Sequence, residues 1–348
     1  MKIGIIGAGS IGSLFGGYLA YLAQKSAVNA DMEVEFFGRE DHIKAINRGG
    51  LKIYTQSDII EVKNIKGYTG IREYKKAKNK IEEDMNNSSM YLFLSTKTYD
   101  MKKALREYAS LTEGAKRVII LQNGIGNESV VRQFLSPKKI IRIITSNGAF
   151  LFEPGKVRHT GEGYTKIGAP FVTSGSLSIT EGEGSVIRES AFEKEREDIQ
   201  QDLIVLKNLL TVAGLETSIS ENIIRDSWEK IFVNIGINPF GALTGLKNGE
   251  LIEDPHIKAL MGDAVDEAVR VARAKGIRLS GSEFKALAYD VASKTAENKN
   301  SMLQDVLKGG QTEIDFINGR IVKYAEELNM EVPINRTVSY LVRGLKKS

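Results

Sequence analysis

The amino-acid sequence predicts an α/β fold, in which a domain built on a parallel sheet is followed by an all-helical domain. In the first half of the chain, apolar runs of strand length alternate with helical patterns, as in parallel sheets with helices on both faces. From about residue 198 onward, apolar residues recur every three or four positions, which is typical of helices. At 348 residues the chain is long enough for two cores. We therefore predict a sheet domain over residues 1–172, a charged, Gly- and Ser-containing insertion or linker over 173–197, and a helical domain over 198–348.

The chain opens with a short apolar strand that runs directly into the pattern G-x-G-x-x-G and then into an apolar helix. This is the context of a Rossmann-type dinucleotide-binding domain, whereas an isolated match would indicate an ordinary glycine turn. Gly7 permits a tight turn, Gly9 allows close approach of a pyrophosphate, and Gly12 lets the helix pack closely on the strand. The free N–H groups at the start of the helix would face the phosphates. The predicted cofactor-binding residues here are Gly7, Gly9, Ser10, Ile11 and Gly12.

The end of the second predicted strand, residues 32–39, indicates which dinucleotide binds. NAD sites usually carry Asp or Glu there, about 20 residues after the glycines, to bind the ribose hydroxyl. This strand instead ends in Phe37-Gly38-Arg39. A guanidinium is suited to a 2′-phosphate, so the sequence favours NADP(H). NAD(H) remains possible because Glu40 follows, and the alternative for Arg39 is a surface charge without a ligand.

Further elements follow from the same patterns. Strands are predicted over residues 90–95, 117–121 and 139–144, and strand-like sequence continues through 157–168. Residues 72–87 and 173–197 are rich in charge and are predicted to be exposed loops or a short charged helix. Helices are predicted over 199–213, 221–236, 256–275, 281–294 and 312–329, with a last helix after Pro333.

Composition excludes several classes of function. The chain is 42% hydrophobic and 26% charged, as in soluble globular proteins, and its net charge of +4 gives no support to nucleic-acid binding. It has no cysteine, and its three histidines show no metal-ligand spacing, so no metal site is predicted. No apolar run approaches the roughly 20 residues that span a bilayer. Because the first strand begins at residue 2, there is no room for a signal peptide, and we expect a cytoplasmic protein.

The helical half contains a polar stripe within an apolar helix. Lys230, Asn234 and Asn238 are spaced four residues apart, which places them on one helical face. Buried polar groups need partners, and a substrate can be one. The alternative is a helix with one solvated face. Pro239 should end or kink the helix beside Asn238 and leave nearby carbonyl groups free.

Two other clusters carry polar residues. The first runs from Asn298 through Ser301 to Glu313, where Gln311 or Thr312 could cap a helix and the dipole alone would explain an acidic first turn. The second comprises residues 95–99 and 122–126, each of which follows a buried strand. Ligands bind at such carboxyl ends of parallel strands, although Asn123-Gly124 could equally form a simple turn.

Together, these segments resemble the ketopantoate reductase family, in the right order and over nearly the whole chain. The two insertions are the exceptions. The matching segments are GAGSIG at 7–12, STKTYD at 95–100, QNGIGNE at 122–128, HTGEG at 159–163, WEKIFVNIGINPFGALTG at 228–245 and SMLQDVLKGGQTEIDFINGRIV at 301–322.

The resemblance implies a role for each matching residue. Lys230 would be the general acid that protonates the ketone oxygen as hydride arrives, and Glu313 would assist this step and hold a substrate hydroxyl. The remaining positions would contact ligands: Asn234, Asn238, Asn298 and Ser301 the substrate, Lys97 and Asn123 the nicotinamide side of the cofactor, and Arg39 the 2′-phosphate.

The expected activity is therefore the NADPH-dependent reduction of 2-dehydropantoate (ketopantoate) to (R)-pantoate, a step in pantothenate and coenzyme A biosynthesis. One alternative is a related NAD(P)H-dependent D-2-hydroxyacid dehydrogenase acting on another branched 2-oxo acid. Another is a nucleotide-sensing module without turnover. The expected partner is a small-molecule 2-oxo acid, with no nucleic acid or membrane, and a homodimer is plausible.

Overall fold

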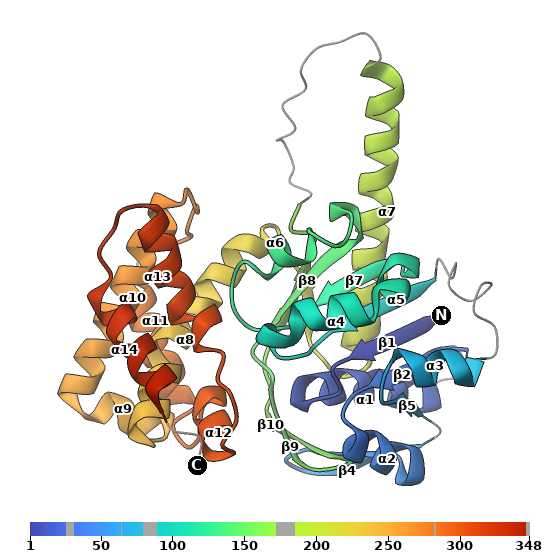
Figure 1. The fold of residues 1–348 in the computed structure, drawn as a ribbon, viewed down its shortest axis with the longest axis horizontal. Coiled ribbons are helices and arrows are strands. Elements are labelled where there is room, and N and C mark those ends of the chain that lie inside the picture. Colours follow the sequence, from blue (N-terminus) through green and yellow to red (C-terminus); the bar gives the residue numbers. More distant parts are fainter. Residues whose placement is uncertain (26–30, 64, 79–88, 172–184, 282, 346–348) are drawn as a thin grey trace. The chain divides into compact units, whose positions relative to one another are not determined.

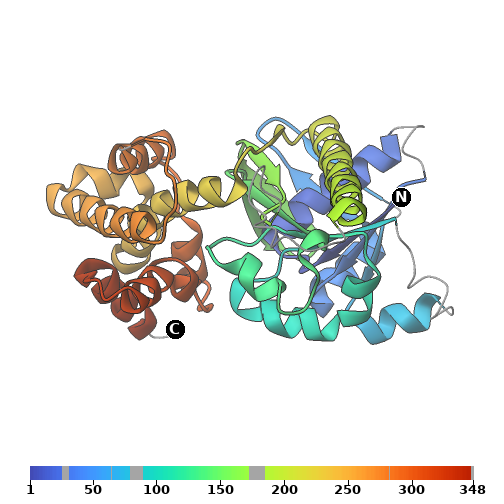
Figure 2. The ribbon, with the colours of Figure 1, turned by 90° about the horizontal axis from the view of Figure 1, so that it is seen from above.

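The computed structural model describes residues 1–25, 31–63, 65–78, 89–171, 185–281 and 283–345, and the backbone alone for 185–192. The chain forms two compact units (Figures 1 and 2). The sheet unit comprises Met1–Gln122 and Gly126–Ile223, and the helical unit comprises Asn123–Ile125 and Ile224–Ser348. The predicted fold class, a Rossmann-type α/β domain followed by a helical domain, is confirmed.

The sheet unit is built on eight strands in the order β12-β11-β8-β7-β6-β1-β2-β5. The strand that precedes the glycines, β1, pairs in parallel with β2 on one side and β6 on the other, so the strand order reverses beside it. Apart from β11, which runs antiparallel to β8, neighbouring strands are parallel. The strands are β1 Lys2–Ile6, β2 Glu33–Phe37, β5 Lys66–Tyr68, β6 Met90–Leu94, β7 Arg117–Ile120, β8 Ile140–Thr145, β11 Thr165–Gly168 and β12 Thr217–Ile219.

Helices cover both faces of this sheet, which explains the nearly continuous apolar sequence of its central strands. Ile5 and Phe36 face α1 and α7 in one core, whereas Ile6 and Phe37 face α4 and α5 in the other. Figure 2 shows these two layers. The helices of the unit are α1 Ser10–Lys25, α2 Glu40–Gly49, α3 Ile71–Lys78, α4 Met101–Glu107, α5 Ala109–Gly114, α6 Asn127–Val131 and α7 Ser185–Val212, with 3-10 turns at Thr98–Asp100 (η2) and Pro137–Lys139 (η3).

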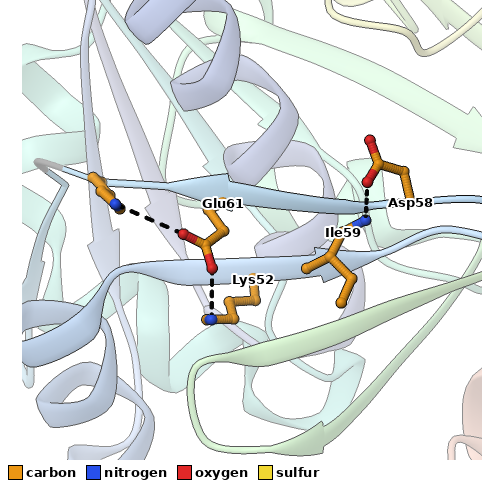
Figure 3. A network of polar contacts seen from close by, with 5 residues as sticks. Lys52, Asp58, Ile59 and Glu61 are labelled. Carbon is orange, nitrogen blue, oxygen red and sulfur yellow. Dashed lines mark hydrogen bonds and ion pairs between the residues drawn. The ribbon is translucent and has the colours of Figure 1, made fainter.

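A second, four-stranded sheet packs on α1 and was only partly anticipated from the sequence. Its order is β4-β3-β10-β9, with β3 Leu51–Tyr54, β4 Ile59–Val62, β9 Gly148–Glu153 and β10 Lys156–Gly161. Leu51, Ile53 and Val62 join the core, while Lys52 and Glu61 lie opposite each other on the outer face in a 2.6 Å ion pair (Figure 3). Such cross-strand pairs fix the register of an exposed sheet face.

Helix α7 packs on the sheet unit, although its sequence was assigned to the helical domain. Ile199, Leu203 and Leu210 are buried in the core that contains α1, and the helical unit begins at Ile224, later than the predicted residue 198. A helical pattern shows which face is apolar but not which core receives it. Of the predicted linker 173–197, residues up to 184 lie outside the described part of the chain, and the rest belong to α7.

Helix α3 accounts for the first part of the other predicted insertion. It buries Tyr74, and Lys78 forms a 2.7 Å ion pair with the buried carboxylate of Glu35 in β2. The prediction of a short charged helix is therefore confirmed for residues 72–78, whereas 79–88 lie outside the described residues.

The helical unit surrounds α8, the helix that contains the polar stripe. The structure departs from two predicted helices here. Helix α8 continues through Pro239 to Thr244, so of the two predicted effects of this proline, ending or kinking the helix, it does not have the first. The predicted helix 312–329 is divided at Ile317, whose φ of −112° and ψ of −102° are not helical. The elements are α8 Ile223–Thr244, α9 Asn248–Glu253, α10 Pro255–Ala274, α11 Phe284–Lys294, α12 Ser301–Leu307, the 3-10 turn η4 Ile314–Phe316, α13 Asn318–Glu327 and α14 Pro333–Gly344. No helix of the described residues is long and apolar enough to cross a bilayer.

Candidate active site

The three glycines of the opening turn, Gly7, Gly9 and Gly12, have different surroundings. Gly7 has a φ of 96°, a left-handed conformation that favours glycine. A Cβ on Gly12 would collide with the carbonyl oxygen of Gly7 and with Ser95 Oγ, so this position keeps α1 close to β1. A Cβ on Gly9 would meet only Gly7 O, at 3.9 Å, among the described residues. Open space at Gly9 beside the start of a helix fits a bound pyrophosphate.

The first residues of α1 are half-buried, and one of them has a structural contact that the sequence did not indicate. Ser10 Oγ accepts a hydrogen bond of 3.0 Å from the backbone N–H of Leu151 in β9. Its hydroxyl hydrogen is not used in that bond, so Ser10 can still donate to an anion. Ile11 follows it, partly buried against the same core.

Arg39 lies two residues after the end of β2 and is exposed, directly before the start of α2. Behind it, His42 is buried between α1 and the turn that joins β9 to β10. Its Nδ1 accepts a 2.9 Å hydrogen bond from the N–H of Gly155, so its Nε2 donates to Ser13 Oγ, also at 2.9 Å. Burial and, secondarily, the charge of Arg39 lower the pKa of His42 to about 4. His42 is therefore neutral at physiological pH.

The carboxyl ends of β6 and β7 lie next to the glycine turn. Thr96, two residues after the end of β6, forms the backbone that a side chain at Gly7 would hit. The amide of Gln122, two residues after the end of β7, donates to Thr96 Oγ1 at 3.2 Å. Lys97 is half-buried at the start of η2. The structure therefore places the predicted cofactor residues of the sheet unit around one end of its parallel strands.

Asn123 belongs to the helical unit and contacts the predicted catalytic lysine. Lys230 Nζ donates a hydrogen bond of 2.9 Å to Asn123 Oδ1. A Cβ on the next residue, Gly124, would lie 2.7 Å from the carbonyl oxygen of Phe316 in η4. The loop after β7 thus contacts both α8 and the turn that follows Glu313.

The polar stripe of α8 is intact because the helix is continuous over its whole length. Lys230 and Asn234 are half-buried and Asn238 is 5% exposed, which excludes a fully solvated face. Glu313 is also buried, at 7% exposure, immediately before η4. Glu313 therefore precedes a three-residue 3-10 turn and does not lie in the first turn of the predicted helix 312–329, and its side chain makes no cap bond to η4.

Asn298 and Ser301 are exposed beside the start of α12. Asn300 lies between them and is buried. Its Oδ1 accepts the N–H of Leu303 at 3.0 Å and caps the helix, while its Nδ2 lies against Gly241 of α8. Asn300 was not predicted as a site residue, although an Asn before an apolar helix is a typical cap.

Two family models match the chain and together span most of it. Residues 3–170 match the model described as "Ketopantoate reductase PanE/ApbA", and residues 222–346 match "Ketopantoate reductase PanE/ApbA C terminal". The 2-dehydropantoate 2-reductase of Pyrococcus abyssi is 36% identical over 99% of this chain and 97% of that protein. The chain belongs to the ketopantoate reductase family.

Ketopantoate reductases from distant sources resemble it along the whole chain. The 2-dehydropantoate 2-reductase of Archaeoglobus fulgidus is 31% identical over 99% of this chain and 98% of that protein. Among solved structures, the ketopantoate reductase of Ralstonia eutropha JMP134 has a TM-score of 0.76 and 26% identity, covering 99% of this chain and 97% of that one. D-mandelate dehydrogenase in complex with NADH and anilino(oxo)acetate has a TM-score of 0.77 and 25% identity, with the same coverage. As a member of the ketopantoate reductase family, the protein is an oxidoreductase.

Proposed function

We propose that the protein reduces 2-dehydropantoate to (R)-pantoate with NADPH, a step of pantothenate and coenzyme A biosynthesis. The observation that carries the proposal is the position of Lys230, whose ammonium is held 2.9 Å from Asn123 Oδ1 on the face of α8 that also carries Asn234 and Asn238. Relatives named 2-dehydropantoate 2-reductase, matched over nearly their full length, support this substrate.

The cofactor proposal depends on the glycine turn and Arg39. The open space at Gly9 suits a pyrophosphate, and the exposed guanidinium of Arg39 at the end of β2 suits a 2′-phosphate. We therefore propose NADP(H), with NAD(H) as the alternative because the D-mandelate dehydrogenase structures contain NADH. When bound, the reduced nicotinamide supplies the hydride. Lys97 and Asn123 would line its position.

Lys230 supplies the proton in this proposal. Negative charge develops on the ketone oxygen as it is reduced, and an adjacent ammonium stabilises that charge and donates a proton, an effect of about 10²–10⁴-fold. The amide oxygen of Asn123 accepts a hydrogen bond but cannot take the proton at neutral pH. Asn123 thus orients the ammonium.

The remaining residues bind the substrate. Glu313 is a buried carboxylate, which can accept a hydrogen bond from a substrate hydroxyl and favours the positive charge of a nearby ammonium. Asn234 and Asn238 on α8 present amide groups to the substrate oxygens. Asn298 and Ser301, exposed beside α12, would bind its carboxylate.

A second candidate substrate is another branched 2-oxo acid. It is favoured by the similarity to D-mandelate dehydrogenase, which has a TM-score of 0.77 to this chain. The solved structure of that enzyme contains anilino(oxo)acetate, an aromatic 2-oxo acid analogue. The proposed roles of Lys230 and Glu313 are the same for either substrate, so these two residues do not discriminate between them.

A substrate panel separates the possibilities. NADPH consumption is measured with ketopantoate, 2-oxoisocaproate and phenylglyoxylate under identical conditions. The proposal predicts the highest kcat/KM for ketopantoate. Equal or better turnover of the other two acids would identify a broader D-2-hydroxyacid dehydrogenase. NADPH binding without oxidation by any of the three would identify a nucleotide-sensing module.

A further inference from the structure

Helix α8 contains a proline at a position where a helical hydrogen bond is normally made. Pro239 has no N–H, so the carbonyl group of Ile235, four residues earlier, cannot receive its usual helical partner. Ile235 is buried, and an unpaired buried carbonyl group is costly. This turn lies between Asn234 and Asn238, two residues of the proposed substrate-binding face.

Asn318, at the start of α13, provides the missing donor. Its Nδ2 donates to Ile235 O at 3.4 Å and to Asn335 Oδ1 at 3.0 Å, and its side chain is fully buried. Among the described residues, Asn318 Oδ1 has no hydrogen-bond partner. The amide is therefore oriented entirely toward the turn of α8 and toward Asn335.

The orientation of both amides is determined by their neighbours. Asn335 Nδ2 faces two acceptors, Ala264 O at 2.8 Å and Glu267 Oε2 at 2.8 Å, so Asn335 Oδ1 must face Asn318. Glu267 also accepts the N–H of Ile334 at 2.9 Å at the start of α14. A buried chain of hydrogen bonds thus runs from Glu267 in α10 through α14 and α13 to α8, where it ends on the carbonyl group that Pro239 leaves unpaired.

We propose that Asn318 is a positioning residue for the substrate-binding face of α8. By donating to Ile235 O, it fixes the turn between Asn234 and Asn238 and so sets the position of Asn238 relative to Lys230 and Asn234. The inference rests on the proposed function, since it concerns the 2-oxo acid bound by these residues. It assigns no direct contact between Asn318 and substrate.

A double-mutant cycle with N318A, P239A and N318A/P239A tests this role. In P239A the new N–H of residue 239 can donate to Ile235 O, which makes the Asn318 amide redundant. We expect N318A to raise the KM for ketopantoate about tenfold, as for a misaligned polar contact, and to leave the Kd for NADPH unchanged. In the P239A background, the same substitution should leave KM unchanged.

The matched control is V338A, which removes buried apolar volume from α14 in the same unit without touching the hydrogen-bond chain. It should lower Tm without changing the KM for ketopantoate.

Three results would overturn the proposal. They are an N318A protein with lowered Tm but wild-type KM, a V338A protein whose KM rises as much as that of N318A, and an N318A/P239A protein whose KM stays as high as that of N318A. If N318A does not fold, N318S, which keeps a donor on a shorter side chain, is compared in both backgrounds. A wild-type protein that reduces none of the three 2-oxo acids overturns the proposed function and this inference with it, whereas an active wild type with unchanged KM in N318A overturns the inference alone.

Discussion

Lys230 Nζ donates a 2.9 Å hydrogen bond to Asn123 Oδ1, and this contact joins residues 107 positions apart. Asn123 directly follows Gln122, whose amide is bonded to Thr96 at the carboxyl end of β6. The residue that orients the proposed acid is therefore attached to the strand end where dinucleotides bind in this type of sheet. The amide of Asn123 thus restrains the Lys230 ammonium.

The glycine turn gives a matched pair of substitutions. G12A should destabilise the protein by about 1–3 kcal/mol, because its Cβ would collide with the backbone of Gly7. G9A should fold with wild-type stability, since the nearest atom to its Cβ is 3.9 Å away, but should raise the Kd for NADPH about tenfold by occupying the proposed pyrophosphate position. Urea denaturation and NADPH titration measure the two effects. If G9A binds NADPH as tightly as the wild type does, the pyrophosphate does not lie there.

Arg39 should distinguish the two dinucleotides. R39A should raise the Kd for NADPH about 10–100-fold, the range for a hydrogen bond to a charged group, and change the Kd for NADH little. The ratio of the two constants is measured by titration of the same preparations, with K44A in α2 as an exposed control that also removes one positive charge. A ratio that is unchanged in R39A would mean that the guanidinium does not contact the phosphate.

His42 predicts a pH dependence of folding. Its pKa is about 4 in the folded protein, lowered by burial and by Arg39, and about 6.5 when unfolded. Between these values the unfolded state binds more protons, so the free energy of unfolding falls as the pH is lowered from 6.5 to 4, by up to about 3 kcal/mol. H42Q does not titrate and should lack this loss.

The test compares urea denaturation of wild type and H42Q at several values of pH. Burial also lowers the pKa of His159, but that residue is common to both proteins and its effect cancels in the difference. Parallel pH curves for the two proteins would show that His42 is protonated equally in the folded and unfolded states.

The sequence was informative wherever the signal is local. The opening strand and glycines, the apolar strands β6 to β8 and the four-residue spacing of Lys230, Asn234 and Asn238 all lie within short segments, and the structure retains them. The family resemblance added Glu313, whose burial no local pattern indicates.

Features that depend on distant partners were not predictable. The half-exposed residues of β9 show no clear alternation, so the small sheet was only partly anticipated. The sequence showed that Pro239 would leave a carbonyl group free, but not that Asn318, 83 residues after Ile235, would bind it and allow α8 to continue. Likewise, the apolar face of α7 did not reveal that it packs on the sheet unit.

The most direct test of the central claim is the rate of NADPH oxidation with ketopantoate by wild type and K230A. We predict that K230A lowers kcat about 10²–10⁴-fold, because the ketone oxygen loses its proton donor, while the Kd for NADPH stays within about twofold. Wild-type kcat in K230A, with NADPH still bound, would show that Lys230 is not the acid and would contradict the account.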